Sequence, residues 1–509
     1  MKLRTKPVMR TKTLAPRLKM YIKTATFLLC VFLGSVSSCC VNGRYYPRYH
    51  LSPPHGWMND PNGFCYFKGE YHMFYQYNPM SSLEAGIAHW GHAKSKDLCH
   101  WKHLDLAIYP DQWYDQTGVF SGSALVENDV MYLYYTGNVN LTDEMPFEGQ
   151  FQALGISTDG VHVEKYKDNP IMYTPNHQPH IRDPKVWEHD GSYYMVLGNA
   201  YDDYTKGQIV MYESSDKINW QEVTILYKSN GSFGYMWECP DLFEIDGKFV
   251  LLFSPQGVKS VGDMYQNLYQ AGYIVGEFDY DTHSFTILTE FRELDHGHDF
   301  YATQTMKDPS GRRIVVAWAS TWEYAYPERA DGWAGMLTLP RTLTLTKDLR
   351  LIQTPIREID QVFRRRLYSG KASAGKTVAL PDKAGKVELK WDTPRNIKVV
   401  IESQNECQNV VISYDHEDGT ITLDRGGDDA IRRTHWDPRG HLKWTIFIDA
   451  SSIELSCGDG EVWFTSRFFP EGVVSVRLGE DTCVDKFTVH SIRRTTPDPE
   501  AHCRCESEE

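Results

Sequence analysis

The chain has 509 residues, of which 41% are hydrophobic and 24% charged, a balance that excludes a mainly disordered, collagen-like or polytopic membrane protein. Its formal net charge is -14, and because eight of the 53 basic residues lie in the first 23 positions, the remainder is more acidic still. Such a body repels nucleic acid and favours a neutral or cationic small ligand. The length suffices for about two to four domains.

The N-terminal segment has the pattern of a secretory signal. A basic start leads into an apolar run at 25–36, and the small residues Val36, Ser37 and Ser38 follow. The run is about a dozen residues long, too short for the ~20 that span a bilayer, so residues 1–38 are predicted to be a signal cleaved near Ser38. A retained membrane anchor is the alternative. After cleavage we expect no membrane association and a secreted, extracellular protein.

Two sequons and the cysteine count also bear on the predicted secretion. Asn140 and Asn230 begin the sequons and are predicted glycosylation sites. The 11 cysteines are too few for a disulfide scaffold at this length, and none has zinc-finger spacing. We therefore expect no metal site.

Residues 45–350 repeat one hairpin signal with a period of about 60 residues. In each copy a turn containing Gly, Asp or Asn precedes a run of aromatic and aliphatic residues. The five copies lie at 68–77, 128–136, 190–197, 246–254 and 310–318. Hairpin repeats of this period predict an all-β, five-bladed β-propeller, with a β-sandwich as the alternative.

The pattern of strand signals changes after residue 350. Residues 371–494 contain many short strand signals and are predicted to form a β-sandwich. The stretch 351–370, with Pro355 and a charged segment, is assigned to a linker. The polar, acidic stretch 495–509 is predicted to be a disordered tail.

Three of the repeats carry a carboxylate at the same place. Asp60, Asp183 and Glu238 each lie eight or nine positions before the turn glycine of their repeat. Innermost propeller strands meet at the axis, so the three carboxylates are predicted to converge in one pocket. A capping role is the alternative for any one of them. Calcium binding would need a local run of Asp or Asn, which is missing, whereas glycoside cleavage needs a carboxylic acid and a carboxylate.

The residues around these carboxylates resemble glycoside hydrolase family 32, the invertases, fructanases and related β-fructofuranosidases. The motifs that carry the resemblance occur in the family's order over residues 48–490. They are His55-Gly-Trp-Met-Asn-Asp60-Pro-Asn-Gly63, Trp90-Gly-His92, Phe120-Ser-Gly-Ser123, Arg182-Asp183-Pro184, Trp237-Glu238-Cys239-Pro240, Asp299-Phe-Tyr301, Leu339-Pro-Arg341 and, in the sandwich, Asp449-Ala-Ser-Ser-Ile-Glu454.

The resemblance implies a role for each matching residue. Asp60 would be the nucleophile, Glu238 the acid/base, and Asp183 would bind fructose hydroxyls and stabilise the transition state of a retaining reaction. No cofactor or metal would be needed. The substrate-binding candidates are Trp57, Asn59, Gln76, Trp90, Phe120, Ser121 and Arg182, with Tyr301 and Trp318 as candidates at the pocket rim. Trp57, Trp90, Trp237 and Trp333 are candidates for stacking on sugar faces.

The implied substrate is sucrose. The stretch 235–243 looks most like bacterial sucrose and sucrose-6-phosphate hydrolases, but a phosphorylated sugar is intracellular, and the signal, the sequons and the acidic body argue for plain sucrose. Hydrolysis of inulin or levan, and fructosyl transfer, remain alternatives, as does a catalytically silent fructan-binding propeller. The sequence leaves the oligomeric state open. Phe120 replaces the Trp of some members, and Ser456-Cys457-Gly-Asp459 departs from the family's sandwich pattern.

Overall fold

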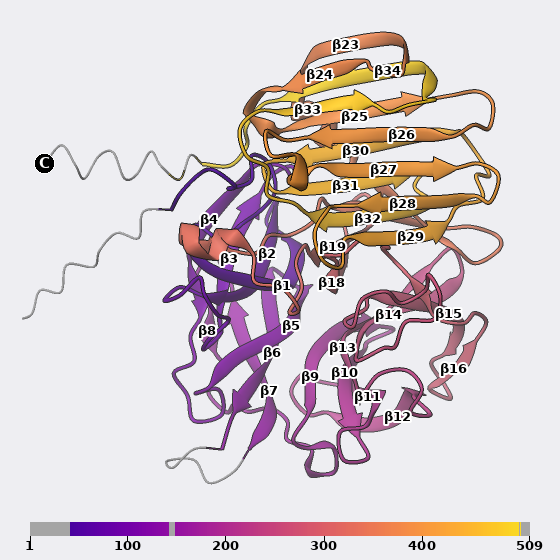
Figure 1. The fold of residues 1–509 in the computed structure, drawn as a ribbon. Helices are drawn as coiled ribbons and strands as arrows, with labels where there is room; N and C mark the ends of the chain where they lie inside the picture. Colours follow the sequence, from indigo (N-terminus) through magenta and orange to yellow (C-terminus); the bar gives the residue numbers. More distant parts are fainter. Residues whose placement is uncertain (1–40, 142–147, 498, 500–509) are drawn as a thin grey trace, which may run out of the picture. The chain divides into compact units, whose positions relative to one another are not determined.

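The computed structural model describes residues 41–141, 148–497 and 499. The predicted signal at 1–38 lies outside the described residues, as does most of the predicted tail at 495–509. Within the described ranges the elements are strands, joined by five short 3-10 helices. The fold is a β-propeller followed by a β-sandwich (Figure 1). No helix in these ranges is both long and apolar enough to cross a bilayer.

Five antiparallel sheets follow one another along the first part of the chain. The first contains β1 (Gly56–Phe67), β2 (Glu70–Asn78), β3 (His89–Ser95) and β4 (Trp101–Ile108). The second contains β5 (Gly118–Glu127), β6 (Val130–Val139), β7 (Gly149–Ser157) and β8 (Glu164–Lys165). The third contains β9 (Ile181–His189), β10 (Ser192–Tyr201), β11 (Lys206–Ser214) and β12 (Gln221–Lys228).

The fourth and fifth sheets complete this region. The fourth contains β13 (Met236–Ile245), β14 (Lys248–Gln256), β15 (Gly272–Asp279) and β16 (Ser284–Ile287), and β17 (Arg292–Glu293) also pairs with β15. The fifth contains β18 (Tyr301–Lys307), β19 (Arg313–Trp318), β21 (Arg341–Leu345) and β22 (Leu351–Pro355). A short strand, β20 (Trp333–Ala334), runs parallel to the start of β1.

The five hairpin signals form the turns between the first two strands of the five sheets. Tight two-residue hairpins need a positive φ in the turn, which Gly, Asn and Asp adopt at least cost. Asp190 and Gly191 have φ values of 48° and 82°, and Asn128 and Asp129 have 51° and 59°. The repeat therefore reflects one local rule used once per sheet.

The first strands of the sheets pack against one another in a ring. β1 contacts β5, β5 contacts β9, β9 contacts β13, β13 contacts β18, and β18 contacts β1. A separate apolar cluster packs each pair of neighbouring sheets. The five innermost strands therefore surround a common axis, which is the arrangement that the convergence argument requires.

Two six-stranded sheets form the sandwich, with one large apolar cluster between them. One sheet has the order β23 (Phe363–Ser373), β34 (Cys483–Ile492), β25 (Gly385–Lys390), β30 (Lys443–Asp449), β31 (Ser452–Cys457) and β32 (Val462–Arg467). The other has the order β24 (Thr377–Leu380), β33 (Val474–Leu478), β26 (Ile397–Glu402), β27 (Val410–Asp415), β28 (Thr420–Asp424) and β29 (Ile431–His435).

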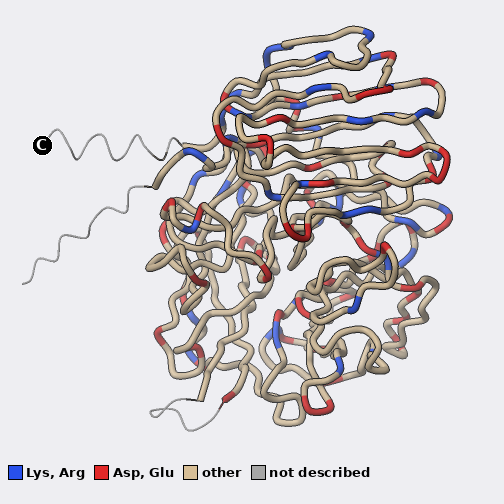
Figure 2. Tube along the Cα trace, viewed as in Figure 1, with Lys and Arg blue, Asp and Glu red and all other residues tan. Residues whose placement is uncertain are grey.

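The stretch assigned to a linker differs from its prediction. Residues 351–355 form β22, the last strand of the fifth sheet, and β23 begins at Phe363. Only 356–362 lie between the two strands, and they include η3 (Arg357–Gln361). The other 3-10 helices are η1 (Pro175–His177), η2 (Pro327–Asp331), η4 (Pro381–Lys383) and η5 (Glu406–Gln408). Charges of both signs are interspersed along the described chain (Figure 2).

A buried charged group, here called the contact cluster, joins the propeller to the sandwich. Its members are His50, Asp295, Arg341, Asp449 and Glu454, all at most 4% exposed. Arg341 lies 2.9 Å from Asp295 and 2.5 Å from Glu454, and His50 lies 2.7 Å from Asp449 and 2.9 Å from Glu454. Three carboxylates thus meet two cationic side chains, which is the pairing that buried charges need.

Candidate active site

Each innermost strand has a break in its pairing near its start. The register of β1 on β2 shifts between Met58 and Pro61, which brackets Asp60. The pairing of β9 with β10 shifts at Arg182–Lys185, and that of β13 with β14 shifts between Glu238 and Asp241. β5 and β18 have corresponding shifts. Such bulges redirect a side chain out of the alternating pattern, here toward the axis.

Three of these bulges hold a non-glycine residue at positive φ. The values are 66° at Asp183, 51° at Cys239 and 51° at Ala302. Such conformations are uncommon for side chains larger than glycine and cluster at functional sites. Two of these positions, Asp183 and Cys239 next to Glu238, lie at carboxylates that the sequence singles out. The three carboxylates, Asp60, Asp183 and Glu238, all lie at register shifts and are here named the acidic triad.

Asp60 is held by two donors from different sides. Ser121 Oγ donates to Asp60 Oδ2 at 2.7 Å, and Asn59 Nδ2 donates to Asp60 Oδ1 at 3.0 Å. The Trp57 indole N–H donates to Asn59 Oδ1 at 3.0 Å, which fixes the Asn59 amide so that its nitrogen faces Asp60. The carboxylate is thereby fixed in orientation.

Cys239 links the other two members of the triad to Asp60. Its backbone N–H donates to Asp183 Oδ2 at 2.9 Å, and its buried thiol lies 3.7 Å from an oxygen of both Asp60 and Asp183. The Asp183 N–H in turn donates to Thr136 Oγ1 at 3.1 Å. Cys239 therefore orients two carboxylates, and no histidine is hydrogen-bonded to its thiol in the described chain.

Glu238 receives four hydrogen bonds. Arg182 donates to Glu238 Oε1 from Nε at 2.9 Å and from Nη2 at 2.6 Å. Gln256 Nε2 donates to Oε2 at 2.6 Å and the Tyr301 hydroxyl at 2.5 Å. The Tyr301 hydroxyl has a second acceptor, the Ser254 carbonyl oxygen at 3.3 Å.

Burial and like charge raise the pKa of two members of the acidic triad, Asp60 and Asp183. Burial, with the charge of Glu238 added, raises the pKa of Asp60 to about 6 against the hydrogen bonds from Ser121 and Asn59. Burial and Glu238 also raise the pKa of Asp183 to about 7, and Arg182 opposes this rise. Perturbed carboxylates gathered in one place are characteristic of active sites.

The other predicted substrate-binding residues divide into those beside the triad and those behind it. Asn59, Ser121, Arg182 and Tyr301 contact the triad directly. Trp90 and Trp318 are fully buried; the Trp90 indole N–H donates to the Phe120 carbonyl oxygen at 3.0 Å. Gln76 donates to the Val119 carbonyl oxygen at 2.9 Å, and Phe120 itself is partly exposed. Trp90 and Gln76 thus brace the strand that holds Ser121.

Stacking on sugar faces was expected of four tryptophans, but the structure buries all four. Trp57, Trp90, Trp237 and Trp333 are at most 3% exposed, and Trp237 and Trp333 belong to apolar clusters. Their sequence context shows an aromatic next to a motif but not which side of a strand is covered. An exposed tryptophan, Trp322, stacks on Trp57 with ring centroids 6.0 Å apart.

Among the residues that contact the site, Gln256 and Trp322 were not predicted from the sequence. Gln256, which donates to Glu238, lies in the stretch Ser254–Gly257, where the sequence shows only a likeness to bacterial members. Trp322 lies in the loop after β19, beyond any motif. Both sequon asparagines, Asn140 and Asn230, are exposed. Thr142 of the first sequon lies outside the described residues.

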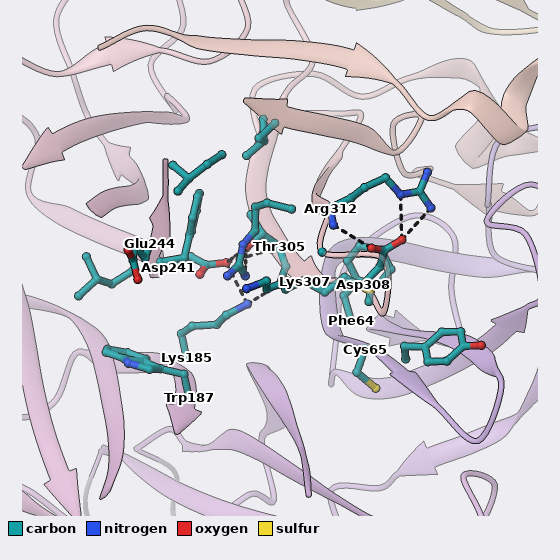
Figure 3. A pocket seen from close by; sticks show the side chains of 18 of the residues that line it. Phe64, Cys65, Lys185, Trp187, Asp241, Glu244, Thr305, Lys307, Asp308 and Arg312 are labelled. Atoms are coloured by element: carbon teal, nitrogen blue, oxygen red, sulfur yellow. Dashed lines mark hydrogen bonds and ion pairs between the residues drawn. The ribbon is translucent and has the colours of Figure 1, made fainter. Parts of the chain in front are cut away.

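A cavity of about 1080 Å³ is lined by residues at the other end of the innermost strands, away from the acidic triad. Figure 3 shows side chains that line it. It is lined by later residues of the same strands, such as Phe64 of β1. Two ion pairs lie in its wall, Lys185 with Asp241 at 2.9 Å and Arg312 with Asp308 at 2.7 Å. Size alone would favour this cavity, but the perturbed carboxylates mark the opposite end. In the described ranges no three His, Cys, Asp or Glu residues form a metal-binding group.

The site defines a class of protein. Two differently held carboxylates, with a third beside them and an arginine on one of them, form the arrangement that cleaves glycosides. The family model "Glycosyl hydrolases family 32 N-terminal domain" matches residues 50–355, and "Glycosyl hydrolases family 32 C terminal" matches 360–491. The chain belongs to glycoside hydrolase family 32 and is a glycoside hydrolase.

Named relatives agree with this assignment. The chain is 37% identical to the raffinose invertase of Escherichia coli over 84% of its own length and 90% of that protein. It is 38% identical to the sucrose-6-phosphate hydrolase of Bacillus subtilis, over 83% and 88% of the two chains. It is also similar to the Bombyx mori GH32 β-fructofuranosidase solved in complex with sucrose, with 39% identity, a TM-score of 0.85 and coverage of 90% and 96%.

Proposed function

We propose that this protein is a β-fructofuranosidase that hydrolyses sucrose to glucose and fructose with retention of configuration, through a covalent fructosyl-enzyme. The observation that carries the proposal is the geometry of the acidic triad, in which the buried Asp60 and the partly buried Glu238 are held by different partners. The sucrose complex of the Bombyx mori protein and the raffinose invertase of Escherichia coli support a fructoside substrate.

Asp60 acts as the nucleophile. It attacks the anomeric carbon of the fructosyl unit, and its carboxylate must be ionised to do so. Donors from Ser121 and Asn59 hold the oxygens in place and stabilise the charge. Because the pKa of Asp60 is raised to about 6, the free enzyme gains the nucleophile as pH rises through that value.

Glu238 acts as the acid and then as the base. Protonated, it gives its proton to the glucosyl oxygen as the glycosidic bond breaks; ionised, it takes a proton from the attacking water. The Tyr301 hydroxyl can serve both states, because it donates to ionised Glu238 and can turn to the Ser254 carbonyl oxygen when Glu238 carries the proton. Asp183, oriented by Cys239, binds fructose hydroxyls and stabilises the oxocarbenium-like transition state.

Plain sucrose fits the site better than sucrose 6-phosphate. The cation over the Trp57 ring, Arg329, already donates to the carbonyl oxygens of Tyr324 and Leu83. Nearby Glu323 is exposed and would repel a phosphate. Inulin, levan and fructosyl transfer use the same triad and differ in the group that leaves or attacks. A silent fructan-binding propeller would not need the Arg182, Gln256 and Tyr301 contacts that converge on Glu238.

We also propose secretion with cleavage near Ser38 and glycosylation at Asn140 and Asn230. The described residues begin to pack just beyond that position, where Val41 joins an apolar cluster with Tyr45. Expression in eukaryotic cells tests this: we expect the enzyme in the medium, with a new N-terminus near residue 39 and a mass that falls on treatment with a glycosidase for N-linked glycans. Activity confined to the cells would contradict secretion.

The reaction is tested by product release from sucrose, sucrose 6-phosphate, raffinose and inulin. We expect equimolar glucose and fructose from sucrose, with β-fructofuranose as the first anomer. Asp60→Ala and Glu238→Gln should each lower kcat by about 10³-fold or more, because each removes one covalent or proton-transfer step. Glu244→Gln, an exposed carboxylate on the same strand as Glu238, is the matched control and should keep wild-type activity. No release from any substrate by folded wild type would contradict the enzyme proposal.

A further inference from the structure

The side of the active site next to Trp57 carries an unusual amount of exposed apolar surface. Met80 is 86% exposed, Leu83 65%, Ile87 52%, Leu268 43% and Trp322 38%. Single exposed apolar residues need no explanation, but a group of them beside a binding site does. We call these five residues the apolar rim.

Side-chain and backbone contacts connect the rim to the acidic triad on the side of β2. Met80, Leu83 and Ile87 lie in the loop between β2 and β3, whose Ala85 packs against the cluster that contains Trp57 and Tyr301. This loop is tied to the loop after β19, because Ser82 Oγ donates to the Arg329 carbonyl oxygen at 2.8 Å and Arg329 Nη1 donates to the Leu83 carbonyl oxygen at 3.4 Å. Arg329 lies 4.6 Å over the Trp57 ring.

The rim continues through Trp322 to the loop between β14 and β15. Trp322 stacks on Trp57 with the rings 16° from parallel. Its neighbour Glu323 lies close to the backbone of Leu268. Tyr269, next to Leu268, packs on Tyr301 at 5.8 Å, and Tyr301 donates to Glu238. The rim therefore borders the side from which Glu238 would protonate the leaving group.

Charge decides what such a rim can accept. Two exposed carboxylates, Glu84 and Glu323, lie among the apolar residues, so a phosphate or a free fatty acid would be repelled. Arg329 is already engaged by two carbonyl oxygens. An uncharged apolar group could cover Leu83 and Trp322 without desolvating either carboxylate or displacing a hydrogen bond.

We propose that this site accepts, and prefers to plain sucrose, β-fructofuranosides whose leaving group carries a neutral apolar substituent, such as an acyl ester on the glucosyl unit. The proposal rests on the proposed function. The bond between the fructosyl anomeric carbon and the glucosyl oxygen breaks, water supplies a hydroxyl to fructose and a proton to the acylated glucose, and the ester stays intact.

The expected difference in KM between the ester and sucrose follows from the burial of apolar surface. A fully buried methylene strengthens binding about fourfold, and a rim open to water on one side gives a fraction of this. For a six-carbon acyl chain we therefore expect a KM roughly tenfold below that for sucrose, with kcat within a few-fold because the reacting atoms are unchanged.

The test compares sucrose with a sucrose ester that carries hexanoyl on the glucosyl 6-hydroxyl, using the full mature chain. We expect kcat/KM to be about tenfold higher for the ester in wild type. Leu83→Ser and Met80→Ser should each raise the KM for the ester three- to tenfold and change the KM for sucrose by less than twofold. Val473→Ser, which changes an equally exposed valine on the sandwich, is the control and should change neither.

Two results would overturn the inference while leaving the proposed function intact. One is an ester that wild type hydrolyses no better than sucrose. The other is a rim variant that raises the KM for both substrates equally, which would make the rim a general support of the loop. Failure to hydrolyse sucrose itself would instead contradict the proposed function. Thermal unfolding of each variant identifies any loss of folded enzyme.

Discussion

Two groups of buried charge in this molecule are built in opposite ways. The acidic triad gathers three carboxylates near one cation, Arg182, whose ion pair within the triad is with Glu238. The contact cluster gathers three carboxylates around two cations that reach all of them. The pKa of Asp60 and of Asp183 is raised, whereas the pKa of Asp449 and of Glu454 is lowered despite burial, because His50 and Arg341 oppose it.

The opposite pKa directions distinguish a group of carboxylates suited to reaction from a group that holds two parts of the chain together. Carboxylates whose pKa lies near neutral pH can exchange protons with a substrate. The like charge of neighbouring carboxylates helps to hold the pKa there. Carboxylates that are fully paired hold two parts of a chain together and exchange nothing. Beside each group a cation lies over an indole ring: Arg329 over Trp57 at 4.6 Å and Arg341 over Trp463 at 3.9 Å.

The largest effect is expected from breaking the contact cluster. Arg341→Met leaves Asp295 and Glu454 buried without their shared cation, and the free energy of unfolding should fall by about 3–5 kcal/mol. Arg329→Met is the matched control, since Arg329 is half-buried and donates to backbone carbonyl oxygens. Chemical denaturation measures both. Equal losses in the two variants would show that the ring contact, and not the ion pairs, carries the effect.

His50 gives the contact cluster a pH dependence. Burial disfavours its charged form, but the hydrogen bonds that the ring donates to Asp449 and Glu454 outweigh this and raise the pKa of His50 to about 9. A raised histidine pKa stabilises the fold fully below the unfolded value of about 6.5, and this stability is lost as pH rises through about 9. We expect a loss of about 1–3 kcal/mol over that window.

The measurement is the unfolding midpoint from pH 6 to pH 10. His50→Gln should lower it at pH 6 and flatten its slope between pH 6.5 and 9. A wild-type slope that persists unchanged in His50→Gln would assign the effect to another group.

The sequence predicted the triad because one local rule repeats. Each hairpin turn needs residues that tolerate positive φ, so the turns are visible, and a fixed offset from them identifies Asp60, Asp183 and Glu238. The bulges that aim these side chains were not visible, because register shifts depend on the partner strand. Gln256 was missed for the same reason: it reaches Glu238 across the pairing of β13 with β14.

The sandwich shows where strand signals fail. β24 and β29 lie at the two ends of their sheet. β29 reads Ile-Arg-Arg-Thr-His, without apolar alternation, since edge strands bury little. Its Arg432 is buried because it pairs with Asp429 and donates to Asn267 of the propeller, a contact that no local pattern encodes. The contact cluster likewise joins residues about 400 positions apart.

The smallest effect is a gain of stability when the charge of Asp60 is removed from the acidic triad. The pKa of Asp60 is raised from 3.8 to about 6, so its ionisation opposes folding, and stability is lost as pH rises from about 4 through 6. Asp60→Asn removes that charge and should raise the free energy of unfolding by about 1–2 kcal/mol at pH 8, with the gain shrinking as pH falls toward 4.

Thermal unfolding of Asp60→Asn and wild type at pH 4, 6 and 8 tests this, and Asp308→Asn is the opposite control. Asp308 is also buried, but Arg312 and Ser310 hold its pKa below the usual range, so its removal should destabilise. A loss of stability in Asp60→Asn at pH 8 would mean that the bonds from Ser121 and Asn59 outweigh burial and the charge of Glu238. The expected gain would instead show that the catalytic end keeps its unbalanced charge for reaction at the expense of stability, which the contact cluster supplies elsewhere.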